Sequence, residues 1–302
     1  MANSGVRQVV LGALFVCVLF TGGARAATKD PFSGEPGDGT FPVIDAHTHN
    51  HFSGQPEKTS KIPDTLEQYQ KEMKELGVVG AVVHTGENQE GYQDLDKYNV
   101  IHCAGTGADV NVKAIEAGLK SGMYRCIKIY LGYVHQWAYD KKYEPAYQLA
   151  EKYKVPVVFH TGDTYSVKGK LKFADPLTID EVAVDHPNIK LVIAHCGNPW
   201  IESAAEVAYK NPNVYLDGSA FEIGIIGKLP KKELQDFIIK PLTWIQGYVD
   251  DPKKLMYGTD WPLADMKGYL NVFKQAVPKK FWKQVFYENA TKVFNFPNLP
   301  KK

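Results

Sequence analysis

Arginine and cysteine are scarce in this sequence, and its charges nearly balance. Three arginines stand among 35 basic residues, and the 302-residue chain carries a formal charge of +1. A near-neutral chain lacks the basic surface that nucleic acids and anionic membranes attract, so we expect neither as a partner. With 44% hydrophobic and 23% charged residues, the composition is that of an ordinary globular protein with a sizeable core.

Cysteine occurs four times, and the spacing matches no zinc site or disulfide framework. Cys17 lies in the N-terminal apolar run, and Cys103, Cys126 and Cys196 lie in apolar, strand-like segments. Three cysteines in an exported chain would leave at least one free thiol. We expect these three to pack as small hydrophobic side chains without a catalytic role.

A long apolar run is also missing, because the run from Val9 to Phe20 is shorter than the roughly 20 residues of a membrane span. Arg7 precedes it and Ala24-Arg25-Ala26 follows it, which predicts a secretory signal peptide over residues 1–26. Cleavage there would remove two arginines and no acids, and so change the formal charge from +1 to −1. We expect an exported protein, periplasmic or secreted, without stable membrane association; an uncleaved anchor is the alternative.

Residues 27–40 are rich in glycine, proline and polar residues, which predicts a loop or flexible leader. After them, apolar runs alternate with helical patterns. The runs are almost continuously apolar, as strands buried on both faces are. They cover residues 41–47, 80–85, 100–106, 126–132, 155–161, 190–196, 214–219 and 254–260.

Segments between these runs have the periodicity of helices. In residues 64–77, Leu66, Tyr69, Met73 and Leu76 share one face, and Gly77 suits the C-terminal cap. Further helices are expected at 143–154, 179–186, 200–210, 231–249 and 280–296. Eight strand and helix units predict a parallel (β/α)8 TIM barrel, with one catalytic domain over residues 41–302. An open doubly wound sheet is the alternative.

Polar residues stand where these strands end, which is where α/β barrels carry their active sites. The first run ends in His47 and His49, which share one side because residues two apart in a strand point the same way. His160, His195 and Asp260 end the fifth, sixth and eighth runs. Imidazoles and a carboxylate from several strands predict a site for zinc or a similar metal, with an open position for a water of lowered pKa.

Four other histidines lack such partners at strand ends. We expect them to be ordinary core or surface residues. They are His84, His102, His135 and His186.

The sequence resembles the amidohydrolase superfamily, in particular its amidohydrolase-related branch of metal-dependent hydrolases and decarboxylases. Four motifs carry the resemblance in order: VIDAHTH (43–49), VVFHTGD (157–163), LVIAHCGNPW (191–200) and YGTDWP (257–262). The segment ENATKVFNF (288–296) resembles the last helix of the family. The resemblance spans nearly all of the chain after the predicted signal peptide.

The resemblance implies that His47, His49 and His160 bind a divalent metal. Asp260 would bind it too and act as general base on a bound water. His195 would bind a second metal or act beside a single one as an acid, base or electrophilic group. Zinc is expected, with Mn²⁺ or Fe²⁺ as alternatives.

Lys128 lies in the fourth run, where some members of the superfamily carry a carboxylated lysine that bridges two metals. A buried lysine otherwise loses its charge or finds a partner, such as a carboxylate or a substrate anion. We therefore expect one metal, with two metals and a carboxylated Lys128 as the alternative.

Residues just beyond the strand ends are candidates for substrate contact, because the loops there define specificity in barrels. The aromatic ones could stack on a flat or apolar substrate or simply pack at the rim. The candidates are Tyr130, Asp163, Asn198, Trp200 and Trp261.

We expect a hydrolase that activates a water to cleave an amide, ester or lactone bond of a small molecule. The first alternative is non-oxidative decarboxylation of an aromatic or unsaturated acid, which needs a cation for the substrate carboxylate. Lys128 could bind the substrate carboxylate. Arg125 lies three residues before Lys128 in the same strand and is therefore expected to face outward. The second alternative is a binding protein on a decayed barrel, which the complete set of candidate ligands disfavours. A homodimer is a further expectation.

Overall fold

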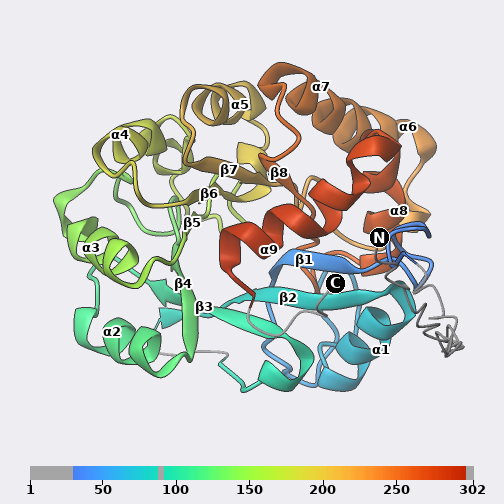
Figure 1. Cartoon of the computed structure of the whole chain (residues 1–302), viewed down its shortest axis with the longest axis horizontal. Coiled ribbons are helices and arrows are strands. Elements are labelled where there is room, and N and C mark those ends of the chain that lie inside the picture. Colours follow the sequence, from blue (N-terminus) through green and yellow to red (C-terminus); the bar gives the residue numbers. More distant parts are fainter. Residues whose placement is uncertain (1–29, 88–91, 297–302) are drawn as a thin grey trace, which may run out of the picture. The chain divides into compact units, whose positions relative to one another are not determined.

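Eight parallel strands follow one another around the sheet in sequence order, β1 to β8, with helices outside them (Figure 1). The computed structural model describes residues 30–87 and 92–296, and the barrel belongs to the compact unit that begins at Pro31. The predicted signal peptide lies outside the described residues. The strands are β1 (Val43–Thr48), β2 (Val78–His84), β3 (Val100–Thr106), β4 (Tyr124–Ile129), β5 (Val157–Phe159), β6 (Leu191–Ile193), β7 (Val214–Asp217) and β8 (Leu255–Met256).

The sheet closes where the chain after β8 runs beside β1. The Ala46 amide donates to the carbonyl of Tyr257 at 2.9 Å, and the Asp260 amide donates to the carbonyl of His47 at 2.8 Å. A parallel bridge between Thr48 and Trp261 continues the pairing. The predicted (β/α)8 barrel is confirmed, and the open doubly wound sheet is excluded because both edges are paired.

The α-helices cover the outside of the sheet. In α1, the Thr65 side chain caps the N-terminus by accepting from the Gln68 amide, and Gly77 takes the left-handed conformation (φ 71°) at the C-terminus. The helices are α1 (Leu66–Leu76), α2 (Val112–Ser121), α3 (Glu144–Tyr153), α4 (Thr178–Asp185), α5 (Ile201–Lys210), α6 (Lys231–Glu233), α7 (Lys240–Val249), α8 (Met266–Ala276) and α9 (Asn289–Phe294).

The helices differ from the sequence-based expectation in several places. The helix expected at 280–296 is divided into a 3₁₀ turn (Lys279–Phe281), a π turn (Gln284–Glu288) and α9. Helices α2 and α8 were not anticipated. Between β2 and β3, the described residues contain only a short 3₁₀ turn, Asp96–Tyr98, so this crossover departs from the regular β/α unit. The single helix expected at 231–249 is divided by a π turn, Leu234–Ile239, which ends just before Pro241, a residue without a backbone N–H.

Residues 31–40, where we expected a loop or leader, form turns. The Asp38 carboxylate accepts from the amides of Thr40 (2.8 Å) and Phe41 (3.0 Å). The Phe32 ring packs edge-to-face on Phe41, with 5.3 Å between the centroids.

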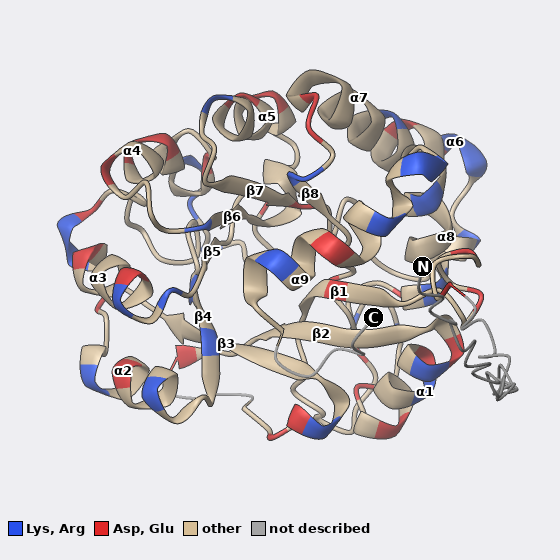
Figure 2. Ribbon diagram, in the orientation of Figure 1, with Lys and Arg blue, Asp and Glu red and all other residues tan. Residues whose placement is uncertain are grey.

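The barrel interior has an apolar half and a polar half. The apolar half contains buried side chains such as Ile44, Val82 and Val192, and Ala290, Val293 and Phe294 of α9 pack onto it. Figure 1 shows α9 lying across the barrel on this side. The polar half is at the other end, where the strands finish. On the outside of the barrel, charged residues of both signs lie scattered over the helices (Figure 2).

The expectation that the cysteines pack as separate hydrophobic side chains is wrong for two of them. Cys103 and Cys126, paired residues of neighbouring strands β3 and β4, form a disulfide inside the barrel. Their 23-residue separation hid the pairing, because only strand register brings the two positions together. Within the described part of the chain, Cys196 is the free thiol, and it is buried.

None of the described helices combines the length and apolar character that a membrane span requires.

We expect the double variant Cys103→Ala/Cys126→Ala to fold with a free energy of unfolding about 3 kcal/mol lower than that of the wild type. A crosslink that closes a loop of this length removes about that much chain entropy from the unfolded state. Denaturant unfolding measures the difference, and Cys196→Ala serves as the control that removes a sulfur without removing a crosslink. Equal stability of the double variant and the wild type would contradict the disulfide.

Candidate active site

A β-bulge aims the first histidine into the barrel. Ile44 and Ala46 of β1 face the apolar interior, so strict alternation would turn His47 outward. The pairing of β1 with β2 shifts register between Asp45 and Thr48, and His47 consequently faces inward as well. Bulges of this kind re-aim side chains next to active sites.

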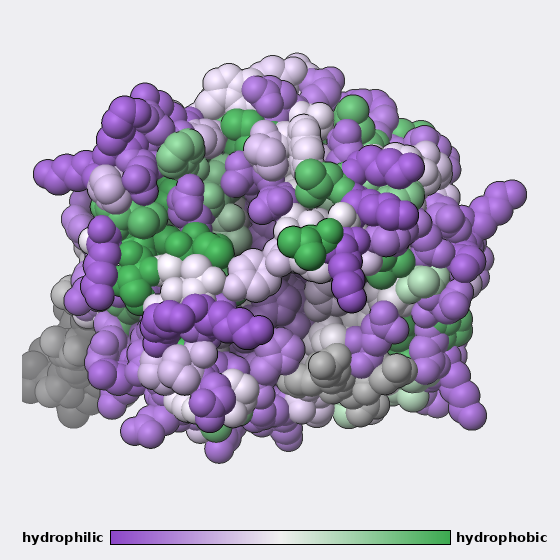
Figure 3. Space-filling view, turned by 180° about the vertical axis from the view of Figure 1, so that it is seen from behind, coloured by the Kyte–Doolittle hydropathy of each residue, from purple (hydrophilic) through white to green (hydrophobic). Residues whose placement is uncertain are grey.

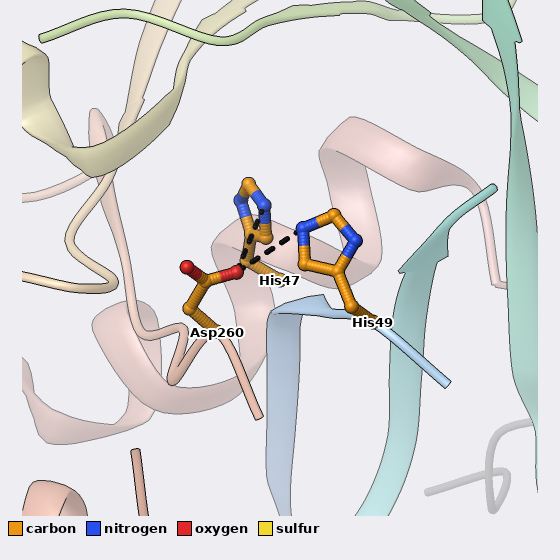
Figure 4. Close-up of side chains that lie close together, drawn as sticks. All are labelled: His47, His49 and Asp260. Atoms are coloured by element: carbon orange, nitrogen blue, oxygen red, sulfur yellow. Dashed lines mark ion pairs between the residues drawn. The ribbon is translucent and has the colours of Figure 1, made fainter. Parts of the chain in front are cut away.

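His47, His49 and Asp260 come together at the end of the barrel where the strands finish (Figure 4). Asp260 Oδ1 lies 3.5 Å from Nε2 of His47 and 3.2 Å from Nε2 of His49. One ligand atom from each residue lies within 4.8 Å of the other two. His47 Nε2 and Asp260 Oδ1 are buried and have no hydrogen-bond partner. Two imidazole nitrogens and a carboxylate oxygen in this arrangement could hold a metal ion.

Asp217 orients His47, and sequence reasoning missed it. Its Oδ2 accepts a short hydrogen bond from Nδ1 of His47, which leaves Nε2 as the nitrogen with the free lone pair. Its Oδ1 accepts from the Ser219 amide at 2.8 Å. Burial raises the pKa of Asp217 to about 7, against the opposing hydrogen bonds from Ser219. Its position at the end of the seventh strand was the available signal.

Asp45 fastens β1 to the chain after β8. Its Oδ1 accepts from the amides of Thr259 (3.0 Å) and His47 (3.1 Å), and its Oδ2 accepts from the Thr259 hydroxyl. Burial raises the pKa of Asp45 to about 7, while these hydrogen bonds lower it. The aspartate of the VIDAHTH motif thus holds in place the two segments that carry His47 and Asp260.

His160 and His195, which follow β5 and β6 in the chain, line a cavity at this end of the barrel. Nδ1 of His160 donates to the carbonyl of Leu131 at 2.8 Å, and Nδ1 of His195 lies 2.9 Å from the Ser219 hydroxyl. Burial lowers the pKa of His160 well below its usual value and that of His195 to about 4. Both rings are therefore neutral near pH 7. His160 lies outside the compact group of His47, His49 and Asp260.

Asp260 remains ionised although it is buried. Burial raises its pKa, but the neighbouring His49 and the charges of His195 and Lys128 lower it to about 2. Its backbone has φ 67°, in the left-handed region that few residues other than glycine adopt.

Lys128 lines the cavity and is fully buried. Its Nζ has no hydrogen-bond partner and lies 5.5 Å from the centre of the Tyr130 ring. Burial lowers the pKa of Lys128 to about 8, against the charges of Asp217 and Asp260, which raise it. The half-buried Arg125 does not line the cavity.

The expectation that His84 is an ordinary core residue is wrong. It ends β2, lines the cavity, and its ring centre lies 3.9 Å from that of His47. The sequence signal for this position was that His84 stands two residues after Val82, which faces the barrel interior. His102, His135 and His186 lie outside the cavity lining, as expected.

The cavity has a volume of about 730 Å³. Figure 3 shows this face of the molecule, with hydrophobic side chains beside a hydrophilic recess. Four of the five proposed substrate contacts line the cavity: Tyr130, Asp163, Asn198 and Trp200. Trp261 does not, because it is fully buried and packs on Tyr69, with 4.8 Å between the ring centres. Tyr133 and Glu222 line the cavity without having been anticipated.

The amidohydrolase family model matches residues 44–296, which includes every residue of this site. The chain belongs to the amidohydrolase family. Among curated proteins, no sequence matches the chain significantly. The resemblance seen in the four motifs is thus confirmed at the level of the family.

Solved structures share the fold of this amidohydrolase. A TIM-barrel protein from Bordetella bronchiseptica has a TM-score of 0.64 at 19% identity, covering 84% of this chain and 98% of the other. A probable 2-pyrone-4,6-dicarboxylic acid hydrolase from Acinetobacter baumannii has 0.60 at 15%, covering 84% and 99%. The 5-carboxyvanillate decarboxylase of Sphingomonas paucimobilis has 0.56 at 10%, covering 85% and 99%. The similar enzymes thus include a hydrolase and a decarboxylase.

We expect Asp217→Asn to weaken metal binding by about 10- to 100-fold, because an amide holds the His47 ring and raises its basicity less well than a carboxylate does. Competition with a chelator measures the affinity for zinc. Asp109→Asn, an exposed residue paired with Lys142, is the matched control. Thermal unfolding checks the fold of both variants, and an unchanged zinc affinity in a folded Asp217→Asn would contradict this role.

Proposed function

We propose that this amidohydrolase is a metal-dependent hydrolase that cleaves an amide, ester or lactone bond of a small molecule. The observation that carries the proposal is the convergence of His47, His49 and Asp260 beside a cavity that is large enough for such a substrate, and that His49 and Asp260 line. His47 Nε2 and Asp260 Oδ1 are buried without hydrogen-bond partners, and a bound cation would satisfy both atoms.

We propose that His47, His49, His160 and Asp260 hold one divalent ion, preferably zinc, with manganese or iron as alternatives. When bound, such an ion lowers the pKa of a water and polarises the oxygen of the scissile bond. His195 stands beside this site as a neutral imidazole. In the alternative with two ions, His195 binds the second and Lys128 is carboxylated. The unpartnered Nζ of Lys128 is compatible with either state.

Asp260 and His195 divide the proton chemistry in this proposal. The ionised carboxylate of Asp260 accepts a proton from the attacking water and passes it to the leaving group. His195, held by Ser219 through Nδ1, directs Nε2 at the substrate as a hydrogen-bond donor or acceptor. Asp217 keeps the His47 ring in one orientation throughout.

Decarboxylation of an aromatic or unsaturated acid is the second candidate. Lys128 favours it, as a buried cation without a hydrogen-bond partner that could receive the substrate carboxylate. We rank it second because Lys128 is the one lysine in the lining of the cavity, and no arginine joins it among the described residues.

We also propose that the chain is exported after loss of residues 1–26. The buried Cys103–Cys126 disulfide supports this, because disulfides persist mainly in oxidising compartments. Formation of a homodimer stays a prediction.

Asp260→Asn is expected to lower kcat by at least about 100-fold, because an amide cannot accept the proton from water. The fold, followed by circular dichroism, and most of the metal content, followed by elemental analysis, should be retained. Turnover at the wild-type rate would refute the role of Asp260.

His47→Ala/His49→Ala is expected to lose bound metal, measured by elemental analysis of the purified protein. His135→Ala/His186→Ala, outside the cavity, is the matched control for the loss of two imidazoles. Metal content equal to that of the wild type in the first variant would overturn the proposed ligand set.

A substrate screen separates the two candidate reactions. We expect turnover of esters, lactones or amides without release of carbon dioxide. Release of carbon dioxide from a phenolic acid, detected with a coupled assay, would reverse the ranking.

A further inference from the structure

The charged side chains that line the cavity differ in burial, since Lys128 is fully buried, Asp163 is exposed and Glu222 is partly buried. We call the buried part of the lining the floor and the more exposed part the mouth. Among the described residues of the lining, Lys128 is the one lysine, and the carboxylates are Asp163, Glu222 and Asp260. Asp260 belongs to the metal-capable group at the base. A substrate therefore meets a cation at the floor and two further carboxylates at other points of the wall.

At the floor, Lys128 can bind an anionic or carbonyl oxygen of a substrate. The Lys128 side chain is fully buried, lines the cavity, and its Nζ has no hydrogen-bond partner. A buried ammonium without a partner is costly, and a substrate oxygen would supply the missing hydrogen bond.

The mouth carries the opposite sign. Asp163 is exposed in the chain after β5, and Glu222 is partly buried in the chain after β7. Burial raises the pKa of Glu222, and the nearby charge of Glu233 raises it further. No ion pair within 4 Å offsets either carboxylate in the part of the chain that the structure describes. A second substrate carboxylate would be repelled by both.

Aromatic side chains line the same cavity as these charged groups. Tyr133, Trp200 and Phe221 line the cavity. They suit a flat or apolar middle part of a substrate.

Resting on the function proposed above, we propose that the substrate carries a single carboxylate or acyl oxygen bound at Lys128, and a neutral or cationic hydrogen-bond donor that faces Asp163 and Glu222. On this proposal the cavity discriminates against dicarboxylic acids, with Asp163 and Glu222 as specificity-determining residues.

The test is binding of four inert benzene derivatives to the full-length protein as purified, measured by calorimetry. The probes are 3-(aminomethyl)benzoate, 3-(hydroxymethyl)benzoate, isophthalate and 3-(aminomethyl)benzyl alcohol. We expect the affinity to fall in the order of the first three, with about a tenfold or larger difference between the first and isophthalate. The fourth probe lacks a carboxylate and is expected to bind weakly.

Three variants test which residues determine the order of affinities among the probes. Asp163→Asn/Glu222→Gln should reduce the preference for 3-(aminomethyl)benzoate over isophthalate to about twofold or less. Lys128→Met, close in length and apolar, should weaken all three carboxylates and leave 3-(aminomethyl)benzyl alcohol unchanged. Glu181→Gln, a change of the same charge on α4 outside the cavity lining, should leave the order intact.

Isophthalate binding as tightly as 3-(aminomethyl)benzoate, or no binding of any probe at 10 mM (roughly the range of weak millimolar ligands), overturns this inference. An unchanged preference in the double variant, or unchanged carboxylate binding in Lys128→Met, overturns it as well. Because binding is measured without turnover, these results are independent of whether the enzyme hydrolyses or decarboxylates its substrate.

Discussion

The closure of the chain after β8 onto β1 is the constraint on which the site depends. The hydrogen bond from the Asp260 amide to the carbonyl of His47 places a carboxylate from one end of the sequence beside two imidazoles from the other. Asp45 reinforces this seam through the backbone and hydroxyl of Thr259. Without this closure, His47, His49 and Asp260 would belong to opposite edges of an open sheet, more than 200 residues apart in the chain.

The barrel uses its two ends for different physical tasks. At one end, apolar strand residues, the Cys103–Cys126 disulfide and α9 form a packed core. At the other end, the next inward-facing positions carry ionisable groups, because side chains two residues further along a strand occupy the layer above. Cys126 and Lys128 on β4, and Val82 and His84 on β2, show this change within two residues.

Burial sets the charge state of the upper layer. It lowers the pKa values of His160 and His195, so these rings stay neutral and keep their lone pairs available. Asp260 stays ionised through its neighbours, in particular His49. Two neutral imidazoles thus stand near the ionised carboxylate of Asp260, and nitrogen and oxygen ligands of this kind suit a divalent cation.

The sequence by itself determined the order of strands, the barrel and some of the residues that line the cavity, among them Lys128, His160 and His195. These follow from local patterns: apolar runs, their spacing, and polar residues at strand ends. It also determined the family, through four motifs in order. Local periodicity, however, carries no information about which distant positions pair across strands or where a strand departs from regular alternation.

Only the tertiary structure decided the features that depend on register. It joined Cys103 to Cys126, placed Asp217 behind His47, and brought His84 into the cavity. It turned His47 inward through a bulge and buried Trp261 against Tyr69, away from the cavity. Each of these outcomes depends on contacts between segments far apart in the chain, and the packing of the closed barrel, not the local sequence, selects them.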